Sequence, residues 1–309
     1  MRKLILVLLL LSACQFMPVQ KGIPVPPEIR VGTSALDVTF APGSMAGVYM
    51  CQQGEVFLFL KNSGAFDIKG GKYSWILEEQ YLAPVDSAVG EFSLLGKSSY
   101  YPVGGVNQTS FKFESVDLPE QSASYDTTLI FQACYPYKTT AGVPVCIDPD
   151  VRGINKNKPC TAKPVSLNGG QGGPVSVTKV SSVMAPEGDM VRPYFEISIQ
   201  NLGTGTVFAK DAVMLACLRG PGSLNISEVI VRAEVQGNEL VCTPGVVRLD
   251  PAKEATVICK FAEAKYGVDS GTFSSILLVE LDYGYKDVVA WPVAITRLPS
   301  QTPCPVRAY

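Results

Sequence analysis

Tyr135-Pro136-Tyr137-Lys138 occupies the central place in this sequence, because the chain contains it twice: it returns as Tyr283-Gly284-Tyr285-Lys286. Two flanking pairs return with it, Lys112-Phe113 as Lys260-Phe261 and Pro144-Val145 as Pro292-Val293. Each residue of the second set lies 148 positions after its counterpart, without a gap. Self-similarity at a spacing near the length of a domain indicates a duplicated structural unit. The repeat therefore predicts two related domains.

Length and composition allow two domains and restrict their chemistry. A chain of 309 residues, 47% of them hydrophobic, is long enough for two cores of ordinary size. Basic and acidic residues, 26 and 28, nearly balance, so the charge footprint of a nucleic-acid-binding protein is missing. The chain has no histidine, the usual general base of hydrolases and the commonest zinc ligand. These features argue against nucleic acid as a partner and against most triad or metal-dependent catalysis.

Short apolar runs separated by turn residues predict β-strands throughout the chain. Residues 194–200 alternate strictly between apolar and polar side chains, as in a sheet with one solvent-facing side. No segment keeps a helical period for more than two turns, so the parallel α/β folds lack their helices. The predicted strands are residues 36–40, 55–61, 72–77, 107–114, 125–137, 143–147, 175–183, 194–200, 212–218, 229–235, 240–241, 255–261, 274–285 and 288–295.

Each copy of the Tyr-x-Tyr-Lys motif is expected in a late hairpin. Residues 143–147 are predicted to return beside 125–137, and residues 288–295 beside 274–285. Alternate tyrosines at this position favour packing at the edge of a sandwich, with each hydroxyl bonded to the backbone. The alternative is an exposed aromatic platform on which glycans stack. A second hairpin is predicted at Gly237-Asn238, a two-residue turn of the primed type.

Strand density predicts the fold class. The second half carries seven or eight strands in about 120 residues, the density of an immunoglobulin-like sandwich. We therefore predict an all-β fold of two tandem immunoglobulin-like antiparallel β-sandwiches, residues 29–160 and 175–299. The glycine-rich and proline-rich residues 161–174 are expected to be a flexible linker between them. Residues 300–309 are expected to be a C-terminal tail.

A second motif is shared by the two halves. An early apolar strand ends in Asn62-Ser-Gly64 in the first half and in Asn201-Leu-Gly203 in the second, 139 positions later. Asparagine and glycine suit an exposed turn, because they tolerate positive φ and asparagine bonds its own backbone. This strand, followed by Asn-x-Gly and a late Tyr-x-Tyr hairpin, resembles the immunoglobulin-like modules of the CARDB type and of related archaeal surface proteins. The resemblance implies an extracellular sandwich with adhesive or spacer duty, and it supplies no catalytic residues.

The N-terminus has the pattern of an export signal. Three residues with two basic side chains precede the apolar run 4–11, which is too short to span a bilayer. The run ends in Leu11-Ser12-Ala13-Cys14, which resembles the lipobox of prokaryotic lipoproteins. This resemblance implies a signal peptide at residues 1–13, a lipid on Cys14 and anchoring to the cell membrane of a bacterium or archaeon. Residues 14–28 are then a proline-rich tether. The alternative is an ordinary secretory signal with a chance cysteine.

Cysteine number agrees with export, because nine cysteines leave eight for pairing once Cys14 is set aside. Disulfides persist in oxidising compartments outside the cytoplasm. No Cys-x2-Cys spacing suggests a zinc or iron-sulfur site. Two bridges within each half are expected, which leaves nine frameworks open; a Cys146 to Cys160 bridge is one way to tie the join to the first sheet. The disulfide candidates are Cys51, Cys134, Cys146 and Cys160 in the first half, and Cys217, Cys242, Cys259 and Cys304 in the second.

Two further kinds of site are candidates. Asp148 and Asp150 offer the oxygen ligands that calcium prefers, but turn chemistry explains the same residues and Arg152 interrupts the EF-hand pattern. We therefore predict no metal and no cofactor. Asn107 and Asn225 begin N-glycosylation sequons in β-rich segments.

The function predicted from these features is non-catalytic. No nucleophile-base or acid-pair constellation is visible in the sequence, so we expect no enzyme. We expect a lipid-anchored cell-surface protein for adhesion, for protein or glycan binding, or for envelope structure, with surface proteins or glycans as partners beside the membrane. The alternative is a ligand-capturing lipoprotein accessory to a transporter or a surface enzyme complex, which a helical lobe around a closed cleft would favour.

Overall fold

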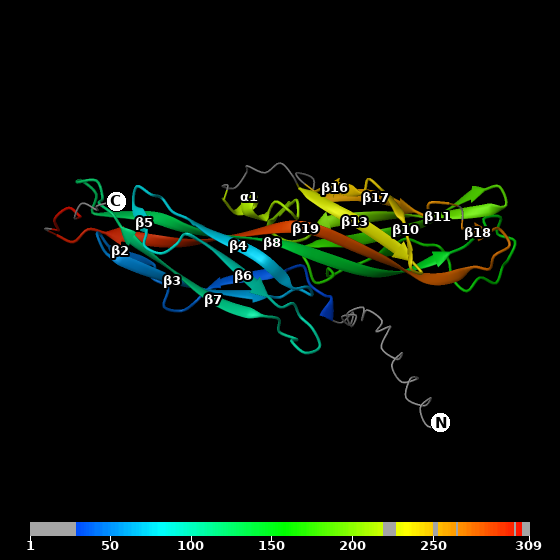
Figure 1. Ribbon diagram of the computed structural model, residues 1–309, viewed down its shortest axis with the longest axis horizontal. Coiled ribbons are helices and arrows are strands. Elements are labelled where there is room, and N and C mark those ends of the chain that lie inside the picture. The colour runs from blue at the N-terminus through cyan, green and yellow to red at the C-terminus, as the bar shows by residue number, and fades with distance from the viewer. Residues whose placement is uncertain (1–28, 219–226, 250–252, 264, 300, 305–309) are drawn as a thin grey trace, which may run out of the picture.

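A computed structural model describes residues 29–218, 227–249, 253–263, 265–299 and 301–304. In these ranges the chain is nearly all β, as predicted, with one short helix, α1 Val213–Leu218 (Figure 1). Of the described helical residues, none belong to a helix long and apolar enough to cross a membrane. The strands are β1 Leu36–Phe40, β2 Gly47–Tyr49, β3 Gln53–Asn62, β4 Ile68–Ile76, β5 Leu82–Pro84, β6 Val89–Leu94, β7 Val106–Ser115, β8 Ser124–Ile147, β9 Val165–Ser166, β10 Val175–Glu187, β11 Met190–Asn201, β12 Thr206–Phe208, β13 Glu228–Val235, β14 Asn238–Glu239, β15 Val241–Thr243, β16 Val246–Arg248, β17 Glu254–Lys260, β18 Tyr266–Gly267 and β19 Phe273–Thr296.

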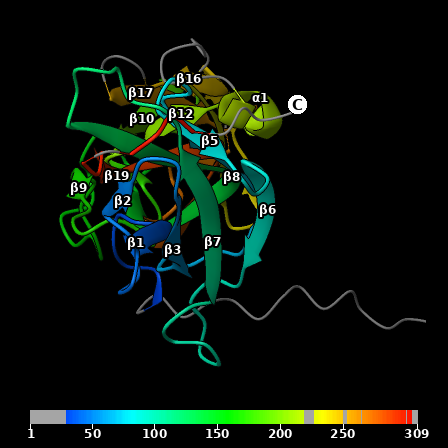
Figure 2. The ribbon, with the colours of Figure 1, turned by 90° about the vertical axis from the view of Figure 1, so that its left-hand side faces the viewer.

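Three sheets make up two sandwiches. Sheet A has the strand order β1-β3-β7-β5, and sheet C has the order β15-β17-β11-β10-β9 with β18 beside β11. Sheet B is larger and runs β14-β13-β19-β8-β4-β6, with β2, β12 and β16 attached. Sheet A packs on one end of sheet B, where Trp75 of β4 stacks on Phe111 of β7 with ring centroids 4.8 Å apart. Sheet C packs on the other end, where Tyr266 of β18 meets Phe273 of β19. Figure 2 shows the molecule from the end that carries sheet A, with β3 and β7 of that sheet side by side.

The two sandwiches share one long ribbon. Strands β8 and β19 are 24 residues each and pair antiparallel along their whole length, from Ser124 opposite Thr296 to Ile147 opposite Phe273. Strand β8 begins over sheet A and ends over sheet C, whereas β19 runs the opposite way (Figure 1). Each half of the sequence therefore completes the sandwich of the other half. The buried apolar side chains of both sandwiches accordingly form one continuous cluster.

The two predicted late hairpins are wrong, because each is a single strand. The predicted turns at residues 138–142 and 286–287 continue the ribbon, and so do Pro144 and Pro292 of the predicted returning strands, opposite Ile276 and Thr128. Beside each proline the described strands leave the outer edge of the ribbon free: β4 pairs with β8 only at residues 130–134, while β12 and β2 pair with β19 at residues 284–286 and 294–296. A proline at a free edge removes no hydrogen bond from the ladder. Each proline therefore marks a place where the ribbon has no outer strand in the described chain, and the chain does not reverse its direction before it.

Most of the other predicted strands are confirmed, and one of them is a helix instead. Strands β1, β3, β7, β10, β11 and β17 lie where strands were predicted, with ends shifted by a few residues. The hairpin between β13 and β14 is present, but its turn residues are Gln236 and Gly237, both at positive φ, one position earlier than predicted. The predicted strand at 212–218 is wrong, because Val213–Leu218 is helical. A short apolar run fits a buried strand and a helical turn equally well, and the packing of α1 decides between them.

All eight cysteines of the described chain form disulfides, but the pairing within halves is wrong for two of the four bridges. Cys51 pairs with Cys304, and Cys134 pairs with Cys217, so both bridges connect the halves. Cys146–Cys160 and Cys242–Cys259 stay within their halves. The exchange of β8 and β19 is the reason. Strand β19 ends in the first sandwich and brings the C-terminal cysteine with it to β2.

Residues 161–174 are not the flexible linker that their composition predicted. Part of the segment is strand β9, which pairs with β10. The backbone of Gly172 accepts hydrogen bonds from Ala65 N at 2.9 Å and from the Tyr137 hydroxyl at 3.0 Å. Gln171 is buried and bonds both backbone groups of Val177. The glycines here allow close packing at the waist of the molecule, a use of glycine that composition cannot distinguish from flexibility.

Candidate functional site

The two copies of Tyr-x-Tyr-Lys cross each other at the middle of the ribbon. Tyr135 lies opposite Tyr285, and Tyr137 lies opposite Tyr283. All four rings are buried, and neighbouring rings contact one another at centroid distances of 6.0 to 6.4 Å. Burial raises the pKa of every one of these hydroxyls above the ordinary tyrosine value. The tyrosines are therefore structural, and their position is the centre of the molecule rather than the predicted edge.

The Asn-x-Gly and Tyr-x-Tyr motifs form one hydrogen-bonded arrangement, which occurs once in each half. The backbone N–H four residues after the motif asparagine donates to a tyrosine hydroxyl: Phe66 to Tyr137 at 3.1 Å, and Gly205 to Tyr285 at 2.8 Å. The asparagine amide donates back to the carbonyl of the same residue, at 2.8 Å from Asn62 and 3.0 Å from Asn201. The predicted bonding of tyrosine to backbone is thus confirmed. The predicted exposure of the Asn-x-Gly turns is wrong, because both asparagines are buried.

The glycine of each turn is required by the tyrosine. A Cβ atom on Gly64 would lie 2.0 Å from the Tyr137 hydroxyl oxygen, and one on Gly203 would lie 2.3 Å from that of Tyr285. Real side chains do not approach so closely, so only glycine allows the hydroxyl to reach the turn. The sequence showed that both motifs repeat, and the structure shows why they repeat together.

The first tyrosine of each copy, Tyr135 or Tyr283, bonds a different kind of side chain in the two halves. The Tyr135 hydroxyl donates to Asp287 Oδ2 at 2.6 Å, whereas the Tyr283 hydroxyl bonds Thr139 Oγ1 at 2.7 Å. Asp287 lies 148 positions after Thr139, so the two contacts are equivalent. Burial raises the pKa of Asp287 to about 7, although the Tyr135 hydrogen bond opposes the rise and the charge of Asp37 adds to it. Both carboxylates line a cleft of about 300 Å³.

The outer face of the ribbon, opposite the tyrosines, is covered on one side of the crossing. There the helix α1 carries Cys217, which is bonded to Cys134, and Phe208 of β12 packs in the same apolar cluster. Lys286 Nζ donates to the Ala216 carbonyl at 3.0 Å, so it satisfies a backbone group near the helix end. The residues of the ribbon that receive this cover are Cys134, Gly284 and Lys286.

The equivalent face on the other side of the crossing is open. The duplication relates Cys134, Gly284 and Lys286 to Asp282, Pro136 and Lys138, and these three line a groove of about 450 Å³. The other lining residues are Ala65, Phe66, Asp67, Lys69, Tyr137 and Lys210. By the offset of 139, residues 67–69 correspond to β12, but in the described pairing they do not join the ribbon. Pro136 has no N–H to offer a strand at that position.

Charges of the groove are arranged in pairs around an apolar floor. Asp282 is buried and binds Lys210 at 2.9 Å and Arg232, while Lys138 binds Glu280 at 2.9 Å. Burial acts to raise the pKa of Asp282, but the hydrogen bonds of Lys210 and Arg232 hold it below the ordinary value. The lining residues bring no paired nucleophile and base. An open groove with fixed charges and an apolar floor is suited to binding rather than to bond cleavage.

The acidic residues that were considered for calcium are held by a lysine. Lys158 Nζ lies 2.6 Å from Asp148 Oδ2 and 3.3 Å from Asp150 Oδ2. Backbone N–H groups of Ile154 and Asn155 also bond Asp150 and lower its pKa. This loop is clamped by the Cys146–Cys160 bridge, as the sequence suggested. The geometry favours the turn interpretation, with Lys158 as the counter-ion.

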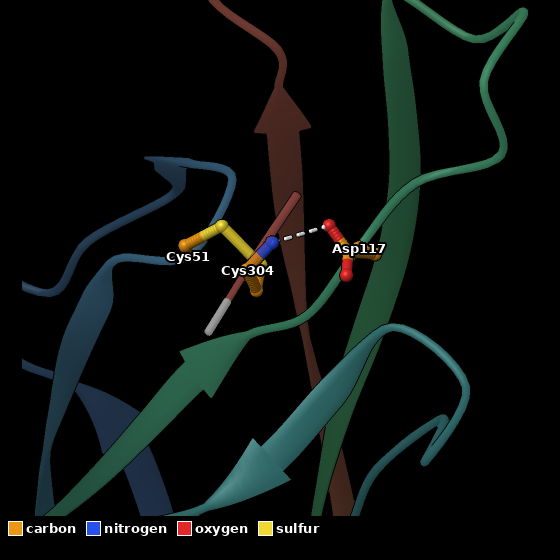
Figure 3. Close-up of side chains that lie close together, drawn as sticks. All are labelled: Cys51, Asp117 and Cys304. Atoms are coloured by element: carbon orange, nitrogen blue, oxygen red, sulfur yellow. Dashed lines mark hydrogen bonds between the residues drawn. A yellow bond between two sulfur atoms is a disulfide. The ribbon is translucent and has the colours of Figure 1, made fainter. Parts of the chain in front are cut away.

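One further cluster brings together ligand atoms of the kind that bind metals. Cys51, Cys304 and Asp117 lie within 4.8 Å of one another at the end of the first sandwich (Figure 3). The two sulfur atoms are bonded to each other, and Asp117 accepts a hydrogen bond from Cys304 N at 2.8 Å. A disulfide offers no thiolate for a metal, so the cluster instead fixes the C-terminal segment at Cys304 to the first sandwich.

Sequence candidates for modification are only partly placed. Asn107 lies exposed at the start of β7, where its side chain accepts a hydrogen bond from Gln108 N at 2.8 Å. Cys14 and Asn225 lie outside the described residues. Sequence reasoning missed Asp287, Lys210 and the groove. The signal for the groove was present in the repeat itself, where Asp282 of the second copy stands in the place of Cys134.

No family model matches the chain, and no curated protein matches it in sequence. Among solved structures, the chain is similar to an ASH / PapD-like domain of human CEP192, PapD-like domain 7. The similarity has a TM-score of 0.16 and 16% sequence identity, and it covers 38% of this chain and 83% of that one.

Proposed function

We propose that this protein is a non-catalytic, lipid-anchored binding protein of the cell surface, and that the groove over Pro136, Lys138 and Asp282 holds a peptide segment of a partner protein. The supporting observation is the unequal use of the two faces related by the duplication. One face is filled by the chain's own β12 and α1, and the equivalent face is an open groove of about 450 Å³. The filled face supplies an internal example of what the ribbon accepts.

The chemistry of the groove agrees with a peptide as occupant. Lys286 binds a backbone carbonyl of α1 on the filled face, and Lys138 occupies the equivalent place in the groove. Phe66 and Pro136 provide apolar surface, while Lys69, with its side chain 80% exposed, provides a charge at the rim. Apolar surface surrounded by polar groups is the usual composition of a site for a protein segment.

Location outside the cytoplasm has its own support. Four disulfides indicate an oxidising compartment. A lipid on Cys14, membership of the CARDB type of immunoglobulin-like modules and an archaeal or bacterial surface belong to the proposal, and they rest on the sequence resemblances. The rival, a ligand-capturing lipoprotein serving a transporter or enzyme complex, called for a helical lobe around a closed cleft. Across the described residues the chain forms sheets and an open groove, so we favour the peptide-binding function.

Site-specific photo-crosslinking on intact cells tests the groove. A photoreactive residue replaces Lys69 at the groove rim or, as a matched control, exposed Lys179 on β10. We expect a discrete crosslinked partner from position 69 alone, and we expect its yield to fall several-fold when Lys138 and Lys210 are both changed to glutamate. Identical products from positions 69 and 179 would argue against the groove as the site. So would a crosslinking yield that stays the same after Lys138 and Lys210 are changed to glutamate.

A further inference from the structure

The loop between β6 and β7 displays apolar side chains to solvent. Tyr100 is 82% exposed at its tip, and Tyr101, Val103 and Val106 are each more than half exposed. Leu95 continues the same surface at the base of the loop. Among residues 95–106 the single charged side chain is Lys97. Several exposed apolar side chains gathered in one short segment are typical of an interaction site.

Hydrogen bonds hold this loop in one shape. Gly105 N donates to Leu95 O at 2.8 Å, and Ser98 and Tyr101 exchange backbone hydrogen bonds at 3.0 and 3.1 Å. The base is fixed to the body, since Lys97 N donates to Gly64 O at 2.8 Å. The tyrosines are therefore presented on a preformed projection, which limits the conformational entropy lost when they bind.

The position of the loop indicates which surface it contacts. The described chain begins at residue 29 and reaches β1, where Leu36 pairs with Asn62. Asn62 N in turn donates to Gly105 O at 2.9 Å, at the base of the loop. Both views show the loop and the first described residues on one side of the molecule, with α1 on the opposite side (Figures 1 and 2). The described chain therefore begins on the side of the molecule that carries the exposed tyrosines.

We propose that residues 95–106 contact the lipid bilayer, with Tyr100 and Tyr101 at the level of the headgroups. This inference rests on the proposed lipid anchor for the identity of the surface. About fifteen residues separate Cys14 from the described chain, a reach of at most about 50 Å, so the bilayer that holds the lipid is within reach of the loop. Tyrosine is enriched at membrane-water interfaces, because its ring is apolar and its hydroxyl is hydrated. The contact lays the long ribbon along the membrane, with α1 facing outward.

Vesicle binding by the full chain carrying Cys14→Ser tests the contact without the lipid. Purified protein is sedimented with vesicles of phosphatidylcholine, with and without phosphatidylglycerol. We expect measurable association, and we expect Tyr100→Ser with Tyr101→Ser to lower the bound fraction by about tenfold, since two apolar rings are lost from the interface. The matched control is Met214→Ser with Leu215→Ser, which removes two exposed apolar side chains from α1 on the opposite side and should leave binding unchanged.

Several outcomes would overturn the contact. These are absence of vesicle binding, an equal loss in the α1 control, or binding of the tyrosine loop to isolated surface glycans in place of vesicles. Cell fractionation separates this failure from failure of the anchor. If Cys14→Ser leaves the chain on membranes and the added tyrosine changes release it, the lipid anchor is refuted and the loop contact stands. If Cys14→Ser releases the chain but vesicle binding ignores the tyrosines, the anchor stands and the loop contact is refuted.

Discussion

Pro136 of β8 lies directly opposite Gly284 of β19. Gly284 is also the residue that corresponds to Pro136 in the second copy of the repeat, 148 positions later. The two copies of the repeat therefore meet at one point and run away from it in opposite directions. This is the geometry of a self-complementary dimer interface, in which each subunit offers the same surface to the other. Here the two subunits are halves of one chain. The duplication produced an internal dimer rather than two independent domains in series.

The shared ribbon predicts that the halves do not separate. A protease site introduced at residues 161–163, where Thr161 and Lys163 are exposed, allows the chain to be cut once. After mild reduction of the disulfides in native buffer, we expect the two fragments to co-elute in gel filtration, because each supplies buried strand residues to the other's core. Elution as two separate folded fragments would instead indicate independent sandwiches.

The close approach of glycine to tyrosine predicts costly substitutions. Gly64→Ala and Gly203→Ala should each lower the free energy of unfolding by about 2 to 3 kcal/mol, because the added methyl group overlaps a buried tyrosine hydroxyl. Gly271→Ala is the matched control, since a Cβ there meets no atom within 4 Å, and it should change stability by less than about 0.5 kcal/mol. Combining Gly64→Ala with Tyr137→Phe should recover part of the loss. Chemical denaturation measures all four variants, and equal effects at Gly64 and Gly271 would contradict the packing argument.

Burial of Asp287 predicts that stability falls as pH rises. Its pKa is about 7 in the folded protein and about 4 in the unfolded chain, so the folded state holds the proton more tightly. Unfolding then releases a proton between these two values, and the free energy of unfolding decreases with pH across that window, by up to about 4 kcal/mol. Denaturation at about pH 4 and about pH 8 spans this window and measures the difference.

Asp287→Asn should abolish most of that pH dependence, because the amide keeps an acceptor for Tyr135 and does not titrate. Exposed Asp189→Asn is the control and should retain it. An Asp287→Asn protein with unchanged pH dependence would place the titrating group elsewhere.

Connectivity of the disulfides distinguishes the internal dimer from separate sandwiches. Proteolysis of the unreduced protein, followed by mass spectrometry, should yield the crosslinked peptides Cys51–Cys304 and Cys134–Cys217, both of which join the halves. The bridges Cys146–Cys160 and Cys242–Cys259 should appear within halves, and thiol titration should find none of these eight cysteines free. A map with every bridge inside one half would refute the exchanged ribbon.

The lipid anchor is tested by a single atom change. Cys14→Ser should move the protein from the membrane fraction to the soluble fraction, because serine cannot carry a thioether-linked lipid. Metabolic labelling with a fatty acid should mark the unchanged chain and leave the serine variant unlabelled. Labelling or membrane partitioning that is the same for both would exclude a lipid at this position.

Local patterns were sufficient for the fold class and for most strands. Alternation in residues 194–200 predicted a half-buried strand, and β11 Met190–Asn201 contains it. The repeat of Tyr-x-Tyr and Asn-x-Gly predicted duplication, and both motifs prove to be parts of one hydrogen-bonded device. Counting predicted that the eight cysteines after Cys14 are all paired, although it did not predict which pairs form. These features depend on side-chain periodicity and composition, which the sequence contains directly.

Which strands lie together was decided by tertiary structure. Pro144 is compatible both with the returning strand of a hairpin at a sheet edge and with the free edge of a continuous ribbon, because in both cases no partner needs its missing N–H. The groove arises from a difference between two equivalent positions that are far apart in the sequence. Cys134 is bonded to Cys217 of α1, whereas Asp282 binds Lys210 and Arg232. The sequence by itself determined that this protein is a duplicated, disulfide-braced β-structure. Only the tertiary structure decided that the copies exchange strands and leave one of two equivalent faces open, because pairing across 148 residues is selected by the packing of the whole core and not by any local pattern.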